Sequence, residues 1–261
     1  MRPTCIRIAF VIAAILASTL LLSPHFYAQP ADQGTGLRVY TSDGFKSSLE
    51  ALLPQAERSI GRKVSPEFDA SKVLQKKIES GDAFDVAILS TNVIDDLIKA
   101  GKISGASTNL GRAGIGVGIR AGAPKPDIRT PEAMKRTLLS AKSIAFNREG
   151  ASAVHINEMV ERLGIADKVK PKFMLEMGAG QPQRDVAAGK AEMVITLMPE
   201  IADFKGLDLV GPLPSDLQSY IDFSAGVAAN SQNAAAAKAL IQFLASPAVA
   251  STLKAQGVDR K

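Results

Sequence analysis

Short runs of apolar and β-branched residues alternate along this chain with segments in which apolar residues recur at helical spacing. The apolar runs are nearly continuous, which is typical of strands covered on both faces. In residues 45–60, 156–163 and 237–244 the apolar positions recur every three or four residues, as on one face of a helix. This alternation predicts an α/β protein with mostly parallel sheets flanked by helices. The predicted strands are residues 37–42, 64–68, 85–89, 115–120, 143–146, 172–175, 193–197, 208–212 and 221–229.

The alternation is interrupted at residues 120–127, where two prolines and a glycine follow an extended strand. Such a segment suits a crossing between two lobes, and the long strand at 220–229 suits the return. We therefore expect one lobe from residues 29–119 plus 219–261 and a second from 120–218, joined by a two-segment hinge. The alternative is one continuous doubly wound sheet with proline-rich surface loops.

The N-terminus has the pattern of a secretory signal peptide. Arg2 and Arg7 precede an apolar run at residues 8–22, and Ala28 offers a small residue for cleavage. We expect residues 1–28 to direct export to the periplasm, with an uncleaved membrane anchor as the alternative. The single cysteine, Cys5, lies in this segment, so the mature chain would have no disulfide, thiolate nucleophile or cysteine metal site.

The charge of the mature chain suits small anions. Removing residues 1–28 takes away Arg2 and Arg7 and no acidic residue, so the formal net charge falls from +5 to +3. This mild excess is consistent with attracting small anions and does not indicate nucleic-acid binding, since the chain has no Trp and only three Tyr. No cofactor or metal is expected, and we expect a monomer.

Small polar loops between strands and helices are the strongest indication of a binding site. Ser42 follows the first strand and precedes a helix, and Ser152 ends the loop that follows residues 143–146. Backbone N–H groups are unpaired at helix starts, and the helix dipole attracts negative charge there. The pattern predicts a cleft that holds a small anion by hydrogen bonds. The alternative for each serine is a plain helix cap.

Five stretches resemble one known family. They are Val-Tyr-Thr-Ser-Asp-Gly-Phe-Lys at 39–46, Gly-Asp-Ala-Phe-Asp-Val-Ala-Ile-Leu at 81–89, Ile-Gly-Val-Gly-Ile-Arg at 115–120 with Ala-Pro-Lys-Pro-Asp at 123–127, Val-Ala-Ala-Gly-Lys-Ala-Glu at 186–192, and Ala-Leu-Ile-Gln-Phe-Leu-Ala-Ser-Pro at 239–247. In order and spacing the chain resembles type II periplasmic solute-binding proteins, in the molybdate-binding branch of the bacterial extracellular solute-binding family.

The resemblance implies a clamshell that closes on its ligand and delivers it to an ABC permease in the inner membrane. It also implies that Ser hydroxyls and backbone N–H groups hold the anion, which here points to Ser42, Ser71, Ala151, Ser152 and Met198. Met198 stands where the branch often has Tyr, and residues 146–150 replace its usual run of small residues. These departures leave a small anion as the expected ligand without specifying molybdate.

Arginines would adapt such a site to carboxylates, because a guanidinium matches the planar geometry of a carboxylate. Arg148 lies inside the expected second-lobe binding loop, and Arg112 and Arg184 are further candidates; the alternative for each is a solvated surface position.

The runner-up function is enzymatic. A few proteins of this fold that resemble the present chain isomerise a small tricarboxylate such as aconitate, a reaction that needs a base near an acidic C–H. His155, Glu149 or a serine could supply it. No Gly-x-Ser-x-Gly motif is present, and one mature histidine without cysteine does not form a common zinc site. We therefore expect a binding protein with no catalytic residues.

Overall fold

The structure is a computed structural model, and it describes residues 36–260. The predicted signal peptide, residues 1–28, lies outside the described residues. Within the described part, no single helix is long and apolar enough to cross a membrane; the bent pair Ala234–Ala245 and Pro247–Ala255 reaches that length and composition only together.

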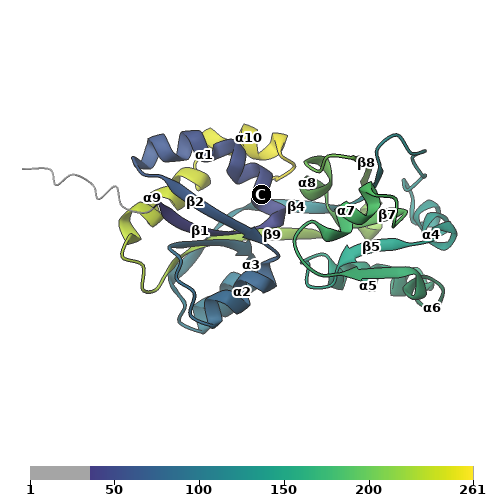
Figure 1. Cartoon of the computed structure of the whole chain (residues 1–261), viewed down its shortest axis with the longest axis horizontal. Coiled ribbons are helices and arrows are strands. Elements are labelled where there is room, and N and C mark those ends of the chain that lie inside the picture. The colour runs from purple at the N-terminus through teal and green to yellow at the C-terminus, as the bar shows by residue number, and fades with distance from the viewer. Residues whose placement is uncertain (1–35, 261) are drawn as a thin grey trace, which may run out of the picture. The chain divides into compact units, whose positions relative to one another are not determined.

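The described strands form two sheets that share the long strand β4 (Figure 1). Residues 103–114 of β4 pair with β9 in the first sheet, and residues 115–120 pair with β7 and β8 in the second. The order across both sheets is β2-β1-β3-β9-β4-β7-β5-β6, with β8 also on β4. The strands are β1 Leu37–Ser42, β2 Val64–Asp69, β3 Val86–Ser90, β4 Ile103–Arg120, β5 Ile144–Asn147, β6 Phe173–Glu176, β7 Met193–Leu197, β8 Leu207–Pro212 and β9 Tyr220–Ala228.

Helices alternate with these strands as the sequence pattern predicts. The α-helices are α1 Lys46–Ile60, α2 Ser71–Glu79, α3 Thr91–Lys99, α4 Pro131–Ser140, α5 Ala153–Arg162, α6 Ala166–Val169, α7 Gln181–Ala187, α8 Met198–Ala202, α9 Ala234–Ala245 and α10 Ala250–Ala255. Short 3-10 turns are η1 Asp43–Phe45, η2 Lys170–Lys172, η3 Ser215–Leu217 and η4 Pro247–Val249.

Parallel pairing holds for the strands that lead into the helices. β1 pairs in parallel with β2 and β3, and β5 pairs in parallel with β6 and β7. β4 and β9 are antiparallel to their neighbours, so both sheets are mixed. Parallel strands end at the same edge, and each sheet therefore gathers the loops before its helices at one edge.

The crossing between lobes expected at residues 120–127 stays a prediction, and the change from one sheet to the other comes earlier in the chain. The chain passes from the first sheet to the second inside β4, between Gly114 and Ile115, and the proline-containing loop leads on to α4. A strand can extend across two sheets without a loop when each half finds its own partner. The polar and glycine-rich residues 104–114 concealed the length of this strand in the sequence pattern.

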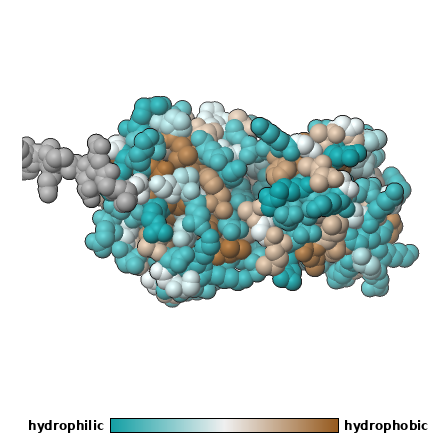
Figure 2. Space-filling model, in the orientation of Figure 1, coloured by the Kyte–Doolittle hydropathy of each residue, from teal (hydrophilic) through white to brown (hydrophobic). Residues whose placement is uncertain are grey.

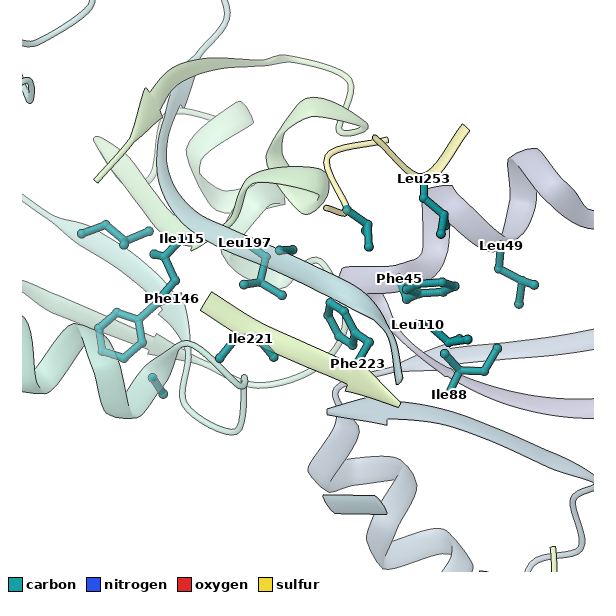
Figure 3. Packing of buried hydrophobic residues seen from close by; sticks show 14 of the residues in the cluster. Phe45, Leu49, Ile88, Leu110, Ile115, Phe146, Leu197, Ile221, Phe223 and Leu253 are labelled. Atoms are coloured by element: carbon teal, nitrogen blue, oxygen red, sulfur yellow. The ribbon is translucent and has the colours of Figure 1, made fainter. Parts of the chain in front are cut away.

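Buried side chains form a core that continues through β4 from one sheet to the other (Figure 3). Phe45 and Phe223 pack edge to face, with ring centroids 5.7 Å apart. On the other side of the β4 crossing, Phe146 packs edge to face on Phe173 at 4.9 Å. The outer surface seen in Figure 2 is mostly hydrophilic, with smaller hydrophobic patches between.

The division into lobes at 119/120 and 218/219 remains our proposal. The first of these boundaries lies close to the point where β4 changes its pairing partner from β9 to β7.

We expect Gly116→Ala to destabilise the protein by about 1–3 kcal/mol, the usual cost of overpacking a filled site. A Cβ at Gly116 would lie 2.8 Å from the carbonyl oxygen of Gly211 and 2.7 Å from Met198, and the backbone oxygen cannot move aside cheaply. Urea unfolding measures the difference, with Ser104→Ala at an exposed position of the same strand as control. Equal midpoints for Gly116→Ala and the control would contradict this packing.

Candidate functional site

A small cavity lies where strands of the two sheets end. It measures about 20 Å³, room for roughly one water molecule. Its walls come from the ends of β1, β2, β5 and β7 and from the starts of the helices that follow. The residues lining this inner cavity are Ser42, Asp43, Ala70, Ser71, Asn147, Gly150, Ala151, Gly180, Pro182, Gln183, Thr196, Leu197 and Glu200.

Ser42 and Ser71 both line the inner cavity and are both buried. Within residues 36–260, the Ser42 side chain makes no hydrogen bond that caps η1. Ser71 is the first residue of α2, and Ala70 occupies the cap position instead. The Ser71 Oγ accepts a hydrogen bond from the Ser90 N–H at 3.0 Å, so its own hydroxyl proton can be donated to a different acceptor. Neither serine acts as a plain cap.

On the opposite wall, the turn after β5 contributes Asn147, Gly150 and Ala151. The Asn147 Oδ1 accepts from the Glu149 N–H at 2.9 Å, and the Gly150 N–H donates to the Asn147 carbonyl at 3.0 Å. These bonds hold the turn in a compact form. Ser152 at the start of α5 is buried, but it is not among the described residues that line the inner cavity.

The structure does not bring Arg148 or Met198 to the inner cavity, as judged from the described residues that line it. Arg148 extends β5 by one residue through an N–H bond to the Glu176 carbonyl, and successive residues of a strand point to opposite sides. Its guanidinium lies 2.8 Å from the Met177 Sδ, over a separate cavity. Met198 packs on Gly114 and Gly116 of β4, where the absence of side chains leaves room.

Arg112, the candidate arginine of the expected first lobe, lies over the Tyr220 ring at 4.4 Å from its centroid. His155 lies 3.4 Å from Glu158 within α5, and it too is absent from the described lining of the inner cavity. Neither residue therefore contributes to this site.

Asp43 and Glu200 are cavity residues that the sequence reasoning missed, together with Thr196 and Gln183. The Glu200 Oε2 accepts hydrogen bonds from the Thr196 Oγ1 at 2.6 Å and the Gln183 Nε2 at 3.3 Å. Asp43 directly follows Ser42, so its place in the loop was available as a signal. Glu200 lies in the first turn of α8, and no spacing rule in the sequence links it to Ser42.

Both carboxyl groups hold protons more tightly than usual. Burial raises the pKa of Glu200 to about 7, and the nearby negative charge of Asp43 adds to the effect. Burial also raises the pKa of Asp43 to about 6, with Asp69 adding to the shift and Lys46 and Arg184 opposing it. A pair of carboxyl groups that titrate near neutral pH is suited to proton transfer.

Two ion pairs join the walls of the site. The Lys76 Nζ on α2 lies 2.6 Å from a Glu149 carboxylate oxygen, and the Lys46 Nζ on α1 lies 4.0 Å from Asp203. The hydrogen bond from Lys76 lowers the pKa of Glu149, which keeps that carboxyl ionised. Glu149, a candidate base in the sequence, is therefore an ion-pair partner between the two sides.

We expect Glu200→Gln to weaken the pH dependence of stability. Because the pKa of Glu200 rises from its ordinary 4.5 to about 7 on folding, the folded state binds the proton more tightly. Stability is then greatest below the unfolded pKa and falls as pH rises through the folded value. A rise of about 2.5 pKa units, at about 1.36 kcal/mol per unit, puts the loss at about 3 kcal/mol at most.

Urea unfolding of the wild type and of Glu200→Gln at about pH 5 and pH 8 measures this effect, with Glu132→Gln at an exposed position as control. The glutamine variant should lose less stability between the two pH values. An identical loss in wild type and Glu200→Gln would contradict the assignment.

The chain is similar along nearly its whole length to proteins of known activity. It is 31% identical over 255 residues to the aconitate isomerase of Pseudomonas sp, which covers 94% of this chain and 93% of the relative. It is 23% identical over 239 residues to the molybdate-binding protein ModA of Azotobacter vinelandii, covering 87% and 91%. The solved periplasmic molybdate-binding protein of Azotobacter vinelandii superimposes with a TM-score of 0.73 at 19% identity, over 86% of this chain and 99% of that one.

These comparisons confirm the predicted two-lobed α/β fold and the predicted branch. Residues 37–259 match the family described as bacterial extracellular solute-binding protein. The match covers all the described strands and helices of both sheets. The chain belongs to the bacterial extracellular solute-binding protein family, in its molybdate-binding-like branch.

Proposed function

We propose that this protein binds a small anion, an oxyanion or a carboxylate, in the cleft between its lobes. The observation that carries the proposal is the inner cavity, where Ser42, Ser71 and the starts of several helices meet. Hydroxyl and backbone N–H donors can satisfy the oxygens of an anion without a full counter-charge, and helix dipoles add to the attraction.

The same geometry supports a role as the exported receptor of an ABC transporter. A ligand that contacts Ser42 on one wall and the turn around Ala151 on the other favours the closed arrangement of the lobes. The ion pair between Lys76 and Glu149 adds to closure and leaves it reversible, since an exposed pair contributes little. A permease in the inner membrane would recognise the closed form.

Removing a hydroxyl donor from the cavity should weaken binding. We expect Ser42→Ala and Ser71→Ala each to lower affinity by about 1–3 kcal/mol, the cost of leaving a buried ligand oxygen without its donor. Ser80→Ala, at the other end of α2 from Ser71, is the matched control. Thermal-shift screening against molybdate, tungstate, sulfate, phosphate and di- and tricarboxylates identifies the anion, and titration calorimetry then measures each variant.

Unchanged affinity in both cavity variants would remove the two serines from the site. A wild-type protein that responds to none of these anions would overturn the proposal.

A second candidate function is isomerisation of a small tricarboxylate, and Asp43 and Glu200 specifically favour it. A receptor that only binds an anion gains nothing from two carboxyl groups in its cleft, because they repel the ligand when ionised. Their pKa values of about 6 and about 7 instead suit a base and an acid at neutral pH. The 31% identity to the aconitate isomerase of Pseudomonas sp supports the same reading.

The chemistry would be a proton shift across an allylic system. One carboxylate removes a proton from the CH2 carbon, that electron pair forms a new C=C bond, and the old double bond takes up a proton at its far carbon. Atoms and electrons balance without a cofactor, and the product differs only in the place and geometry of the double bond.

We expect the purified protein to convert trans-aconitate to cis-aconitate, with turnover lowered at least about a hundredfold in Glu200→Gln, in line with the usual contribution of an acid–base group. Proton NMR of the vinylic hydrogens follows the reaction, with Glu132→Gln as control. Absence of conversion by a wild-type protein that binds trans-aconitate would reject the enzyme and leave the receptor.

A further inference from the structure

A second and larger cavity opens directly beside the inner one. It measures about 540 Å³ and shares Asp43, Gly180, Gln183 and Glu200 with the inner cavity. Its other walls come from α1 and β2 on one side and from α7, α8 and the segment after α8 on the other. We call it the outer cavity; the other lining residues that matter here are Lys46, Phe68, Ala179, Arg184, Asp203 and Lys205.

Charge is ordered along the two cavities. The inner cavity offers hydroxyl donors, the shared boundary carries the carboxyl groups of Asp43 and Glu200, and the outer cavity carries the cations Lys46, Arg184 and Lys205. Asp203 is the outer carboxylate, and it lies 4.0 Å from Lys46. A ligand that fills both cavities therefore meets donors at one end, carboxyl groups in the middle and cations at the other end.

A compact oxyanion does not match this order. Placed in the inner cavity it lies against the two carboxyl groups and does not reach the cations beyond them. An elongated anion with a charge at each end does match it, because its uncharged carbon chain lies beside Asp43 and Glu200. Carboxylates separated by a short carbon chain have this distribution of charge.

Two of the three cations of the outer cavity, Arg184 and Lys46, contact neighbouring groups. The Arg184 Nη2 donates to the Ala179 carbonyl at 2.8 Å and to the Gln181 Oε1 at 3.0 Å. The Lys46 Nζ lies over the Phe68 ring, 5.9 Å from its centroid. A guanidinium fixed in this way is suited to a carboxylate, since less side-chain freedom is lost on binding.

Gln183 adds an independent sign of a ligand at the boundary between the cavities. Its side chain is buried, its Nε2 donates to Glu200, and its Oε1 has no hydrogen-bond partner among residues 36–260. A buried oxygen without a donor is costly, and a hydroxyl or a protonated carboxyl of a ligand would supply one.

We propose that the ligand is a small polycarboxylate that spans both cavities, with one carboxylate at Ser42 and Ser71 and another at Lys46 and Arg184. This inference rests on the anion binding proposed above and specifies its chemical class. Arg184 and Lys46 are then the residues that determine specificity for a second carboxylate, and Asp43 and Glu200 face the carbon chain.

Propane-1,2,3-tricarboxylate tests the proposal, because it has no double bond to shift and so reports binding alone. Titration calorimetry compares it with propionate, sulfate and molybdate in the wild type, Arg184→Gln, Lys46→Gln, Ser42→Ala and the control Arg136→Gln on the surface of α4. We expect the wild type to prefer the tricarboxylate to propionate at least tenfold. Arg184→Gln and Lys46→Gln should each lose at least tenfold affinity for the tricarboxylate and leave propionate binding unchanged.

The outcomes separate this inference from the proposed function. If Ser42→Ala weakens tricarboxylate binding but Arg184→Gln and Lys46→Gln do not, the outer cavity is not part of the site, and the anion receptor stands. A wild-type preference for sulfate or molybdate over every carboxylate also overturns the inference alone. A wild-type protein that binds none of the four ligands overturns the inference, and the wider thermal-shift screen then decides whether the anion receptor stands. Circular dichroism confirms that each variant is folded, and two separate cation variants keep the test valid if one is not.

Discussion

The arrangement of the site depends on one strand. β4 pairs with β9 through its first part and with β7 and β8 through its last part, so both sheets are fixed to a single extended backbone. Gly114 and Gly116 let Met198 of α8 pack closely on this strand. As a result, the ends of β1 and β2 and those of β5 and β7 line the same cavity, and five loops far apart in the sequence meet there.

The cleft carries groups that attract an anion and groups that repel one. Serine hydroxyls and helix starts attract negative charge, whereas Asp43 and Glu200 oppose it when they are ionised. Burial resolves part of this conflict by raising both pKa values toward neutrality, so that the pair can carry a proton. The hydrogen bonds from Thr196 and Gln183 hold one Glu200 oxygen in a fixed direction. A cleft of this kind can combine binding with proton exchange.

A receptor and an isomerase need much of the same structure. Both require a cleft that closes on a small anion, excludes water and holds its carboxylates in fixed positions. The enzyme needs in addition a group that exchanges protons beside the carbon chain. In this protein, serine hydroxyls line the inner cavity and two carboxyl groups lie at its boundary, so the groups suited to each requirement are on different residues.

The sequence alone determined the class of fold, the places where strands give way to helices, and the serine loops that line the cavity. Ser42 was found because an apolar run followed by small polar residues reports local structure, whereas Ser71 and Ala151 came from the resemblance to the family. Arg148 and Met198 were expected in the cavity from their position in the chain, but the direction of a side chain depends on strand alternation and on packing with β4. Glu200, Gln183 and the ion pair between Lys76 and Glu149 were decided only by tertiary structure. Their partners lie far away in the chain or on another element, and only folding brings them together and removes the water that would otherwise set their pKa values.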